Sequence, residues 1–307
     1  MKISDLGLDP TAFVNPHDFD IVSLKAFSKL EKGGVTFLTN ARRMLELPNV
    51  ELALIIIREK DIKYFKDYRG TLYLCENPRL EFIRISNKFL KESAKPNRVE
   101  SNIKISNEAI IGENPSIKSG TIIAGKVRIG DNVQIGHNVV IIGPCSIGNN
   151  CSIASGVIIG EKGVGVERDE NGLAHSFPHI GGVIIGDRVE IGCMSSVACG
   201  TLGNTTISSD VMIDVRCHIG HNSSIGRSST ITAGFMGGGS VKVGEFCFIG
   251  LNSTVINTVR IGDNVTINAG STVNKNVLDG QTVAGNYAIS QTAFLRKTLD
   301  EIKKYGD

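Results

Sequence analysis

The feature that most constrains the fold of this chain is a six-residue repeat of isoleucine. A period of six fits neither an amphipathic helix, which repeats about every 3.6 residues, nor a single strand, which alternates every two. It is typical of a hexapeptide β-helix, in which each repeat lays one short strand along a wall of a prism and points its marker residue inward. The unbroken markers are Ile105, Ile111, Ile117, Ile123, Ile129, Ile135, Ile141, Ile147, Ile153 and Ile159.

The repeat changes phase twice. It stops after Ile159, resumes at Ile185, and shifts again between Val197 and Ile207 before running on to Val273. Gly237 stands at one marker position, and glycine often follows a marker directly. We attribute those following glycines to a backbone that turns tightly or has φ > 0. The two breaks predict loops inserted into a rigid scaffold, and such loops frequently carry function.

Composition excludes several classes of protein. A chain of 307 residues has room for two domains, and its net charge of +2 without long basic runs argues against nucleic acid as a partner. The longest apolar run, Leu52 to Ile57, is far shorter than the roughly 20 residues of a membrane span, and the amino terminus lacks an apolar signal core. Seven cysteines without a CxxC pair indicate packing residues in a reducing cytoplasm.

Three segments differ in pattern. Residues 1–100 predict a small α/β domain, residues 101–288 the β-helix, and residues 289–307 an amphipathic helix with apolar positions Leu295, Leu299 and Ile302. Within the first segment, apolar patterns predict helices over 22–31, 42–47 and 80–90 and strands over 51–57 and 71–74.

The densest polar cluster of the repeat region is the segment from Asp214 to Asn222. His221 follows the marker Ile219 by two places, which puts it at a corner or on an outer wall. If each turn has eighteen residues, Gly239 stacks on His221 in the next coil. An imidazole beside bare backbone N–H groups suits acyl transfer, which needs a base and donors for the oxyanion. Asp214 is the nearest carboxylate in sequence that could fix the tautomer of the ring.

Other interpretations stay open on these residues alone. Gly237, Gly238 and Gly239 also fit tight packing at a corner, and His221 also fits a corner histidine that faces solvent. A serine-nucleophile elbow and phosphate-binding glycine motifs in their usual context are missing from the sequence. The zinc site of γ-class carbonic anhydrases, also a hexapeptide prism, needs a histidine pair five apart, whereas His218 and His221 are three apart. We therefore expect no metal.

The sequence resembles the UDP-3-O-acylglucosamine N-acyltransferases of lipid A synthesis over nearly its whole length. The resemblance rests on residues 36–40, 76–82, 183–192, 200–203 and, most specifically, 214–222. It implies a left-handed prism of about ten turns, three repeats to a turn, and a homotrimer with active sites between subunits. It also implies that residues 1–100 bind the nucleotide, that His221 is the catalytic base and that the Gly239 amide stabilises the oxyanion.

The same resemblance implies a set of substrate-binding residues. Phe37 matches a ring that stacks on uracil, and Arg43 stands where the family has a second stacking residue, tyrosine; a guanidinium can also stack on a base. Thr258 replaces a second functional histidine of the family. The residues expected to contact substrate are Phe37, Asn40, Arg43, His218 and Asn222. We add His179 of the first loop, for which the alternative is a histidine on the surface of a loop without a role in binding.

These observations give three hypotheses. The first is an N-acyltransferase that moves an acyl group from acyl carrier protein or coenzyme A to a nucleotide-linked amino sugar, without a permanently bound cofactor. The second keeps the reaction but uses acetyl-CoA and a deoxy amino sugar on dTDP, UDP or GDP. The third is a trimeric sugar-nucleotide-binding scaffold without catalysis.

Overall fold

The chain forms two compact units, Met1–Pro96 and Asn97–Asp307, in a computed structural model that describes residues 1–41, 50–93, 99–285 and 288–305. Each unit has hydrophobic core residues of its own. The chain is therefore mainly β, with a small α/β unit ahead of a parallel β-helix.

The first unit is built on a five-stranded sheet of order β1-β5-β4-β3-β2, in which β1 is antiparallel to β5 and the other pairs are parallel. Alternate side chains of β4 enter two cores: Leu54 and Ile56 pack in the core that includes Ile85 of α1, and Ile55 and Ile57 pack in the other. The elements, with η for a 3-10 helix, are η1 (Ile3–Leu6), η2 (Pro10–Ala12), β1 (Phe13–Val14), β2 (Ser23–Leu24), η3 (Phe27–Lys29), β3 (Gly34–Phe37), β4 (Leu54–Ile57), η5 (Glu59–Tyr64), β5 (Thr71–Leu74) and α1 (Pro78–Ser93).

Most of the elements expected in this unit are confirmed. Strands β4 and β5 and helix α1 lie where the apolar patterns predict them. The helix expected over 22–31 is wrong: β2 pairs with β3, and only the short η3 forms. Pairing with a neighbouring strand outweighs the local helical pattern there. The helix expected over 42–47 lies outside the described residues.

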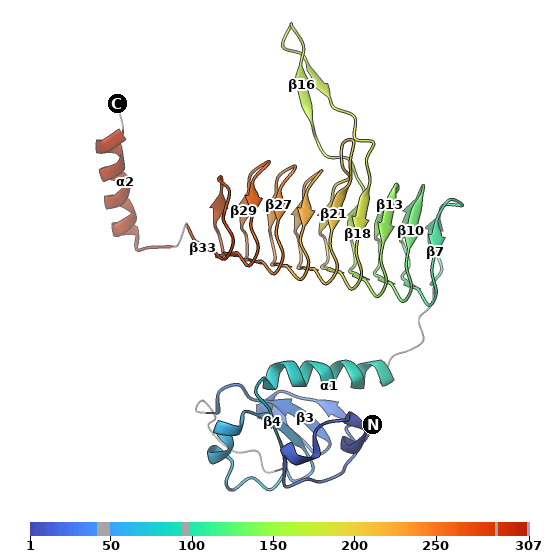
Figure 1. The fold of residues 1–307 in the computed structure, drawn as a ribbon, viewed down its shortest axis with the longest axis vertical. Coiled ribbons are helices and arrows are strands. Elements are labelled where there is room, and N and C mark those ends of the chain that lie inside the picture. Colours follow the sequence, from blue (N-terminus) through green and yellow to red (C-terminus); the bar gives the residue numbers. More distant parts are fainter. Residues whose placement is uncertain (42–49, 94–98, 286–287, 306–307) are drawn as a thin grey trace. The chain divides into compact units, whose positions relative to one another are not determined.

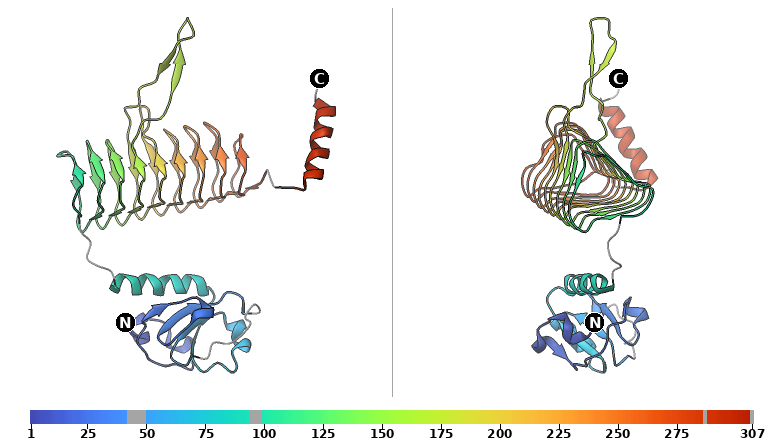
Figure 2. Two further views of the ribbon diagram at one scale, coloured as in Figure 1. Left: turned by 180° about the vertical axis from the view of Figure 1, so that it is seen from behind. Right: turned by 90° about the vertical axis from the view of Figure 1, so that its right-hand side faces the viewer.

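The second unit is a prism of three parallel sheets, here called faces 1, 2 and 3, whose triangular section is visible end-on in Figure 2. Face 1 contains β7 (Ile110–Ile111), β10 (Val127–Ile129), β13 (Cys145–Ile147), β18 (Val183–Ile185), β21 (Thr205–Ile207), β24 (Ser224–Ile225), β27 (Lys242–Val243) and β30 (Arg260–Ile261). Face 2 contains β8 (Ser116–Ile117), β11 (Gln134–Ile135), β14 (Ser152–Ile153), β19 (Glu190–Ile191), β22 (Met212–Ile213), β25 (Thr230–Ile231), β28 (Phe248–Ile249), β31 (Thr266–Ile267) and β33 (Thr282–Val283). Face 3 contains β6 (Lys104–Ile105), β9 (Ile122–Ala124), β12 (Val140–Ile142), β15 (Ile158–Ile159), β20 (Ser196–Val197), β23 (His218–Ile219), β26 (Met236–Gly237), β29 (Thr254–Val255) and β32 (Thr272–Val273).

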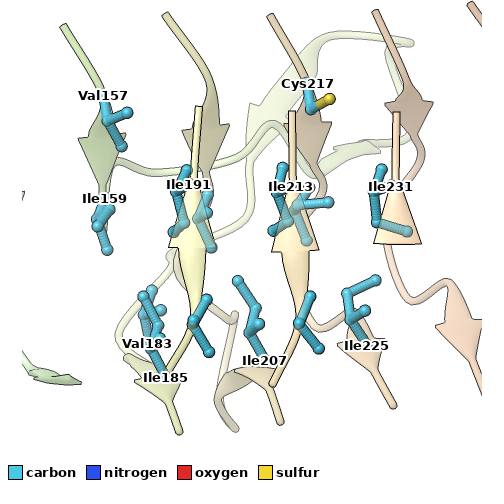
Figure 3. Close-up of a cluster of buried hydrophobic side chains, with 14 of the residues drawn as sticks. Val157, Ile159, Val183, Ile185, Ile191, Ile207, Ile213, Cys217, Ile225 and Ile231 are labelled. Atoms are coloured by element: carbon cyan, nitrogen blue, oxygen red, sulfur yellow. The ribbon is translucent and has the colours of Figure 1, made fainter. Parts of the chain in front are cut away.

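The marker residues pair with one another from coil to coil and point into the prism (Figure 3). On face 1, Ile147 pairs with Ile185 and Ile185 with Ile207, so the register of the ladder survives both breaks. At the amino-terminal end, Ile105 is 41% exposed because it has a neighbouring coil on one side only. The exception at Gly237 has a packing reason: a Cβ there would lie 2.8 Å from the buried ring of Phe235, which fills the space of the missing side chain.

The glycines that follow the markers are explained by close approach rather than by φ > 0, except Gly160, which has φ 89°. A Cβ on Gly226 would lie 2.3 Å from the carbonyl carbon of Gly244 in the next coil, far inside van der Waals contact. The left-handed conformation instead occurs three places after the marker, for example at Asn132 and Asn222. Asparagine tolerates that conformation better than most residues do.

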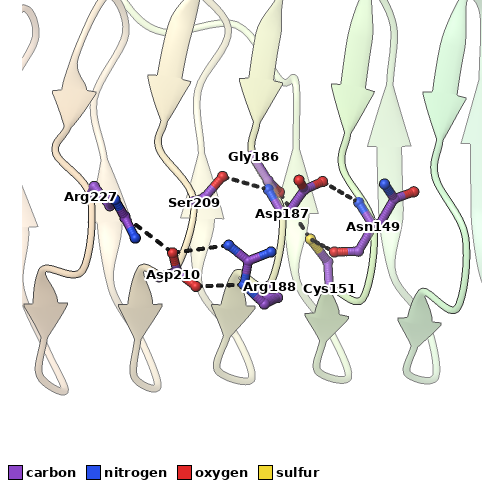
Figure 4. Close-up of polar contacts among 8 residues, drawn as sticks. All are labelled: Asn149, Cys151, Gly186, Asp187, Arg188, Ser209, Asp210 and Arg227. Carbon is purple, nitrogen blue, oxygen red and sulfur yellow. Dashed lines mark hydrogen bonds and ion pairs between the residues drawn. The ribbon is translucent and has the colours of Figure 1, made fainter.

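Side chains at the corners hold successive coils together. Between faces 1 and 2, the Asn149 N–H donates to Asp187 Oδ1 (2.7 Å) and the Asp187 N–H to Ser209 Oγ (3.0 Å), as Figure 4 shows. Beside them, Asp210 accepts from Arg188 (2.6 and 3.1 Å) and from Arg227 (3.3 Å). Corner N–H groups that leave the sheets thus find an acceptor one coil further on.

Both insertions leave the prism at one corner, between faces 3 and 1, which we call the insertion corner. The first insertion, residues 160–182, follows β15 and carries a hairpin of β16 (Val166–Arg168) and β17 (Ala174–Ser176) that projects from the prism in Figure 1. The second, residues 198–204, follows β20 in the next coil. The turn after β23 comes next along the same corner.

The chain ends in helix α2 (Gln291–Tyr305), which confirms the helix expected from the pattern of Leu295, Leu299 and Ile302. Ser290 Oγ accepts the N–H of Ala293 (3.3 Å) and caps its first turn. Neither α1 nor α2, the α-helices of the described ranges, has the length and apolar character needed to cross a membrane.

The contact between coils at Gly226 predicts a strong effect of one methyl group. Gly226→Ala should lower the unfolding free energy by about 1–3 kcal/mol or more, because the obstructing atoms belong to backbone that cannot turn aside. Denaturant unfolding followed by circular dichroism measures the change. Gly203→Ala is the matched control, because a Cβ at Gly203 meets nothing within 4 Å. Equal stability of the two variants would contradict the close-approach explanation.

Candidate active site

His221 and Gly239 occupy equivalent places in successive coils of the insertion corner. Their preceding markers, Ile219 in β23 and Gly237 in β26, are paired, and the Ser240 N–H donates to the His221 carbonyl (2.7 Å). The expected stacking of Gly239 on His221 is therefore present.

The imidazole of His221 lies directly against two glycines. A Cβ on Gly239 would be 2.5 Å from His221 Nε2, and one on Gly163, from the first insertion, would be 2.6 Å from His221 Cδ2. Any larger residue at either position would have to displace the ring. The Nε2 edge of the imidazole thus points along the corner toward Gly239. The ring fits there because Gly239 and Gly163 have no side chains.

A groove of about 780 Å³ runs beside this ring on the outer surface of face 3. Its lining combines His218, Met236 and Thr254 from successive strands with Lys162–Val164 of the first insertion and with the corner residues His221 and Gly237–Gly239. Val164, Met236 and Ile256 expose apolar surface in it. The groove is therefore partly apolar and has an imidazole in its lining.

Asn222, rather than Asp214, is the hydrogen-bond partner of the His221 ring. The carboxamide Nδ2 of Asn222 lies 3.0 Å from His221 Nδ1, and its Oδ1 accepts from the N–H (2.8 Å) and hydroxyl (3.0 Å) of Thr201. The Asp214 carboxylate accepts from the Val215 N–H (2.7 Å) at the corner between faces 2 and 3. The structure does not bring Asp214 and His221 together, because the chain crosses from one corner to the next between them.

The N–H of Gly239 already has an acceptor. It donates to Oδ1 of Asn257 in the following coil (3.1 Å). The same bond joins the Asp131 N–H to Asn149 Oδ1 (2.8 Å) at another corner, so it belongs to the general device that links coils. Asn257 was missed from the sequence, although the eighteen-residue stacking that pairs His221 with Gly239 also pairs Gly239 with Asn257.

His179 comes from the first insertion and is buried, with 5% of its surface exposed. Its ring meets the His221 ring edge to face, with centroids 5.0 Å apart and planes at 82°. Its Nδ1 lies 3.0 Å from the carbonyl oxygen of Phe177, an acceptor only, so the hydrogen of the neutral ring is on Nδ1. Its Nε2 is buried without a hydrogen-bond partner in the described part of the chain.

Burial keeps the groove histidines neutral. His218 is half-buried in the groove lining, with Nδ1 2.8 Å from Ser196 Oγ, and burial lowers its pKa. The pKa of His221 is also lowered, first by burial and then by the neighbouring His179 and His218. Both rings are therefore mainly uncharged near pH 7, as a base requires.

The remaining expected site residues lie in the first unit. Phe37 packs its ring on Phe82, with centroids 4.9 Å apart, and belongs partly to the core. Asn40 lines a pocket of about 370 Å³ together with Arg58, Lys60 and Lys63. These three cations were not anticipated, since the sequence offers no motif around them. Arg43 lies outside the described residues.

No metal-binding cluster occurs in the described ranges: three or more His, Cys, Asp or Glu side chains nowhere gather as ligands there. His175, in strand β17 of the hairpin, pairs instead with Asp169 (2.9 Å). The described side chains thus provide no ligand set for the zinc chemistry considered above.

Comparison with known proteins agrees with this architecture. Residues 108–143 and 126–161 match the model of the bacterial transferase hexapeptide (six repeats), and residues 240–275 match the hexapeptide repeat of succinyl-transferase. Three curated relatives carry the name UDP-3-O-acylglucosamine N-acyltransferase. That of Campylobacter concisus is 33% identical over 99% of this chain and 100% of its own length, that of Campylobacter curvus 34% over 94% and 94%, and that of Delftia acidovorans 34% over 89% and 81%.

Solved structures share the fold at lower identity. The UDP-N-acetylglucosamine O-acyltransferase of Moraxella catarrhalis superposes with a TM-score of 0.57 at 22% identity, covering 66% of this chain and 80% of that one. The UDP-N-acetylglucosamine acyltransferase of Francisella novicida gives 0.56 at 23% identity, covering 67% and 76%. The prism of this chain is accordingly a left-handed parallel β-helix.

Proposed function

Because this chain belongs to the UDP-3-O-acylglucosamine N-acyltransferase family, we propose that it transfers an acyl group from a thioester to the amine of a nucleotide-linked amino sugar in lipid A synthesis. The observation that carries the proposal is the His221 imidazole beside the Gly239 backbone in a groove on face 3. The names of the relatives point to a UDP-linked, 3-O-acylated glucosamine as the acceptor.

His221 would act as the general base. As the sugar nitrogen attacks the thioester carbon, an N–C bond forms and the nitrogen gives its proton to the imidazole. The C–S bond then breaks, and the leaving thiolate takes a proton from the imidazolium. The depressed pKa of His221 supports this role, because a neutral ring is needed. Asn222, not Asp214, would orient the ring. To accept a proton at Nε2, which lies toward Gly239, the ring must carry its own hydrogen on Nδ1.

Gly239 would serve the oxyanion that develops during attack. Its N–H now donates to Asn257 Oδ1, so the thioester oxygen would have to replace this carboxamide oxygen as acceptor. In this exchange, one carbonyl oxygen replaces another as the acceptor of the Gly239 N–H. Asn257 is an exposed side chain in the lining of the groove, which favours the exchange.

The groove fits an acyl donor that binds as a substrate. Val164, Met236 and Ile256 offer apolar surface to an acyl chain, and Lys162 offers a cation to the phosphate of a pantetheine arm. Acyl carrier protein and coenzyme A both present that arm. We include no permanently bound cofactor in the reaction, since the proton transfer and charge stabilisation described need none.

The first unit would hold the nucleotide. His218, in the groove lining, would contact the sugar or acyl group near His221, whereas His179 is buried and neither His179 nor Asn222 lines the groove. In the first unit, Phe37 and Asn40 would face the nucleobase. Arg58, Lys60 and Lys63 line the same pocket as Asn40, and their positive charges suit a diphosphate. On this proposal, residues 1–100 form the nucleotide-binding domain, 101–288 the acyltransferase domain and 289–307 the terminal helix.

Three copies would assemble as a homotrimer. The seven cysteines, all free, suit the reducing cytoplasm.

Removal of the proposed base gives the first test. His221→Ala should reduce kcat/KM for N-acylation by about two orders of magnitude or more, because proton removal from the attacking amine loses its acceptor. Thiol release from an acyl thioester in the presence of the amino-sugar nucleotide measures it. The oligomeric state and unfolding midpoint should match the wild type. Turnover within a few-fold of wild type would reject His221 as the base.

The contact between Gly239 and the imidazole gives the second test. Gly239→Ala should also lower kcat about 100-fold, because the new methyl group would occupy space 2.5 Å from His221 Nε2 and push the ring from the groove. The fold should persist, since the obstructing atoms are the end of a side chain. Gly285→Ala, where the new Cβ also meets nothing within 4 Å and which lies outside both insertions, is the control and should keep full activity. Normal kcat in Gly239→Ala would show that the contact is dispensable.

A panel of substrates separates the three hypotheses. Acyl carrier protein and coenzyme A thioesters from acetyl to long-chain acyl are each offered with UDP-, dTDP- and GDP-linked amino sugars. We expect long-chain transfer from acyl carrier protein to the UDP sugar. Turnover confined to acetyl-CoA and a deoxy amino sugar would establish the second hypothesis. Nucleotide binding without thiol release from any donor would establish the scaffold.

A further inference from the structure

The orientation of the Asn222 carboxamide is fixed by a neighbour that can only donate. Its Oδ1 faces the backbone N–H of Thr201 at 2.8 Å, and a backbone N–H has no acceptor capacity. The Thr201 hydroxyl, at 3.0 Å, adds a second donor to the same oxygen. The amide group of Asn222 must therefore turn its NH₂ the other way, toward His221.

This orientation determines the tautomer of the His221 ring. The NH₂ of Asn222 lies 3.0 Å from Nδ1, so Nδ1 must accept and hold the lone pair. A neutral ring then carries its hydrogen on Nε2, the atom that faces Gly239. In this state the ring presents a donor along the corner, whereas a base acting at that atom needs a lone pair there.

Both insertions favour this tautomer, which carries its hydrogen on Nε2 and which we call the reserved tautomer. The Thr201 carbonyl accepts from the N–H groups of Ile180 (2.7 Å) and Gly181 (2.9 Å), so the second insertion is held by the end of the first. From the first insertion, His179 presents a buried Nε2 without a partner beside the His221 ring.

We propose that Asn222 is a positioning residue that sets the tautomer of His221, and that the ring becomes a base when this carboxamide turns over. After the turn, Oδ1 accepts from Nδ1–H and Nε2 holds the lone pair. Atoms balance within the ring: Nε2 releases one proton to water in the groove and Nδ1 takes one up, so the net charge is unchanged. The proposal rests on the proposed function of His221 as the base.

The turn sacrifices the bond from the Thr201 N–H. One net hydrogen bond corresponds to a population ratio of roughly five to one in favour of the reserved tautomer. The second insertion thereby shifts the tautomer equilibrium of His221 through Asn222, without contacting the ring itself. A ligand that moves Thr201 would shift the same equilibrium, which links the loop at residues 198–204 to the chemistry at Nε2.

Asn222→Asp tests the proposal. A carboxylate can accept from Thr201 with one oxygen and from Nδ1–H with the other, so the variant should lock the base tautomer. The residue has φ 59°, which aspartate tolerates as asparagine does, and the chain should fold normally. The ¹⁵N spectrum of the labelled full-length protein, with His221→Ala assigning the signals, distinguishes the tautomers. We expect Nε2–H in the wild type and Nδ1–H in the variant.

The same variant should move the pH profile. The carboxylate favours the imidazolium, so the pKa of His221 rises and the acidic limb of kcat/KM moves to higher pH by about one unit. Above the limb, kcat/KM should increase up to roughly five-fold, since the reserved tautomer is removed. The other titratable groups that face this region, His179, His218 and Lys162, are the same in both proteins.

Asn276→Asp is the matched control. Asn276 Oδ1 accepts the N–H of Arg260 (2.9 Å) outside both insertions, and Asn276 is not in the lining of the groove. It should leave both the spectrum and the pH profile unchanged. An Nδ1–H signal in the wild type, or an unchanged tautomer in Asn222→Asp, would overturn the proposal. Because the spectra are recorded without substrate, they stand apart from the His221→Ala activity test.

Discussion

The structure depends on backbone pairing between identical faces of successive coils, which is possible only where the coils approach closely and their inward side chains stack. Each marker residue covers the one before it, so the core is a column rather than a sphere. The glycine after the marker permits this approach, because its missing Cβ would fall on the backbone of the next coil. Corner side chains such as Asp187 then satisfy the N–H groups that the sheets leave open.

That rigidity explains where irregular structure occurs. The register between Ile147, Ile185 and Ile207 continues although two segments are inserted between them, so the extra residues must leave the prism at a corner. Both leave at the same corner in adjacent coils. The candidate base His221 lies one coil further on, where residues of both insertions reach it: Gly163 and His179 directly, and Thr201 through Asn222.

The site therefore combines ordinary positions of the repeat with local departures from it. His221 and Gly239 occupy ordinary corner positions, and Asn257 caps the Gly239 N–H as its counterparts do elsewhere. What differs is the absence of a side chain at Gly239, which leaves room for an imidazole to lie along the corner. An ordinary corner of the prism thus forms the candidate active site because Gly239 lacks a side chain and the first insertion adds a loop beside it.

The six-residue period by itself determined the β-helix, the inward markers and the two loops, because these follow from spacing along one repeated unit. The stacking of Gly239 on His221 needed in addition the eighteen-residue turn that the family resemblance implies. The tertiary structure alone decided that Asn222 rather than Asp214 meets the ring, that His179 is buried against it, and that β2 replaces an expected helix. Asp214 lies at a different corner from His221, and His179 and β2 lie outside the regular repeat. No spacing rule relates such segments, and donor and acceptor geometry chooses among them only once the chain is folded.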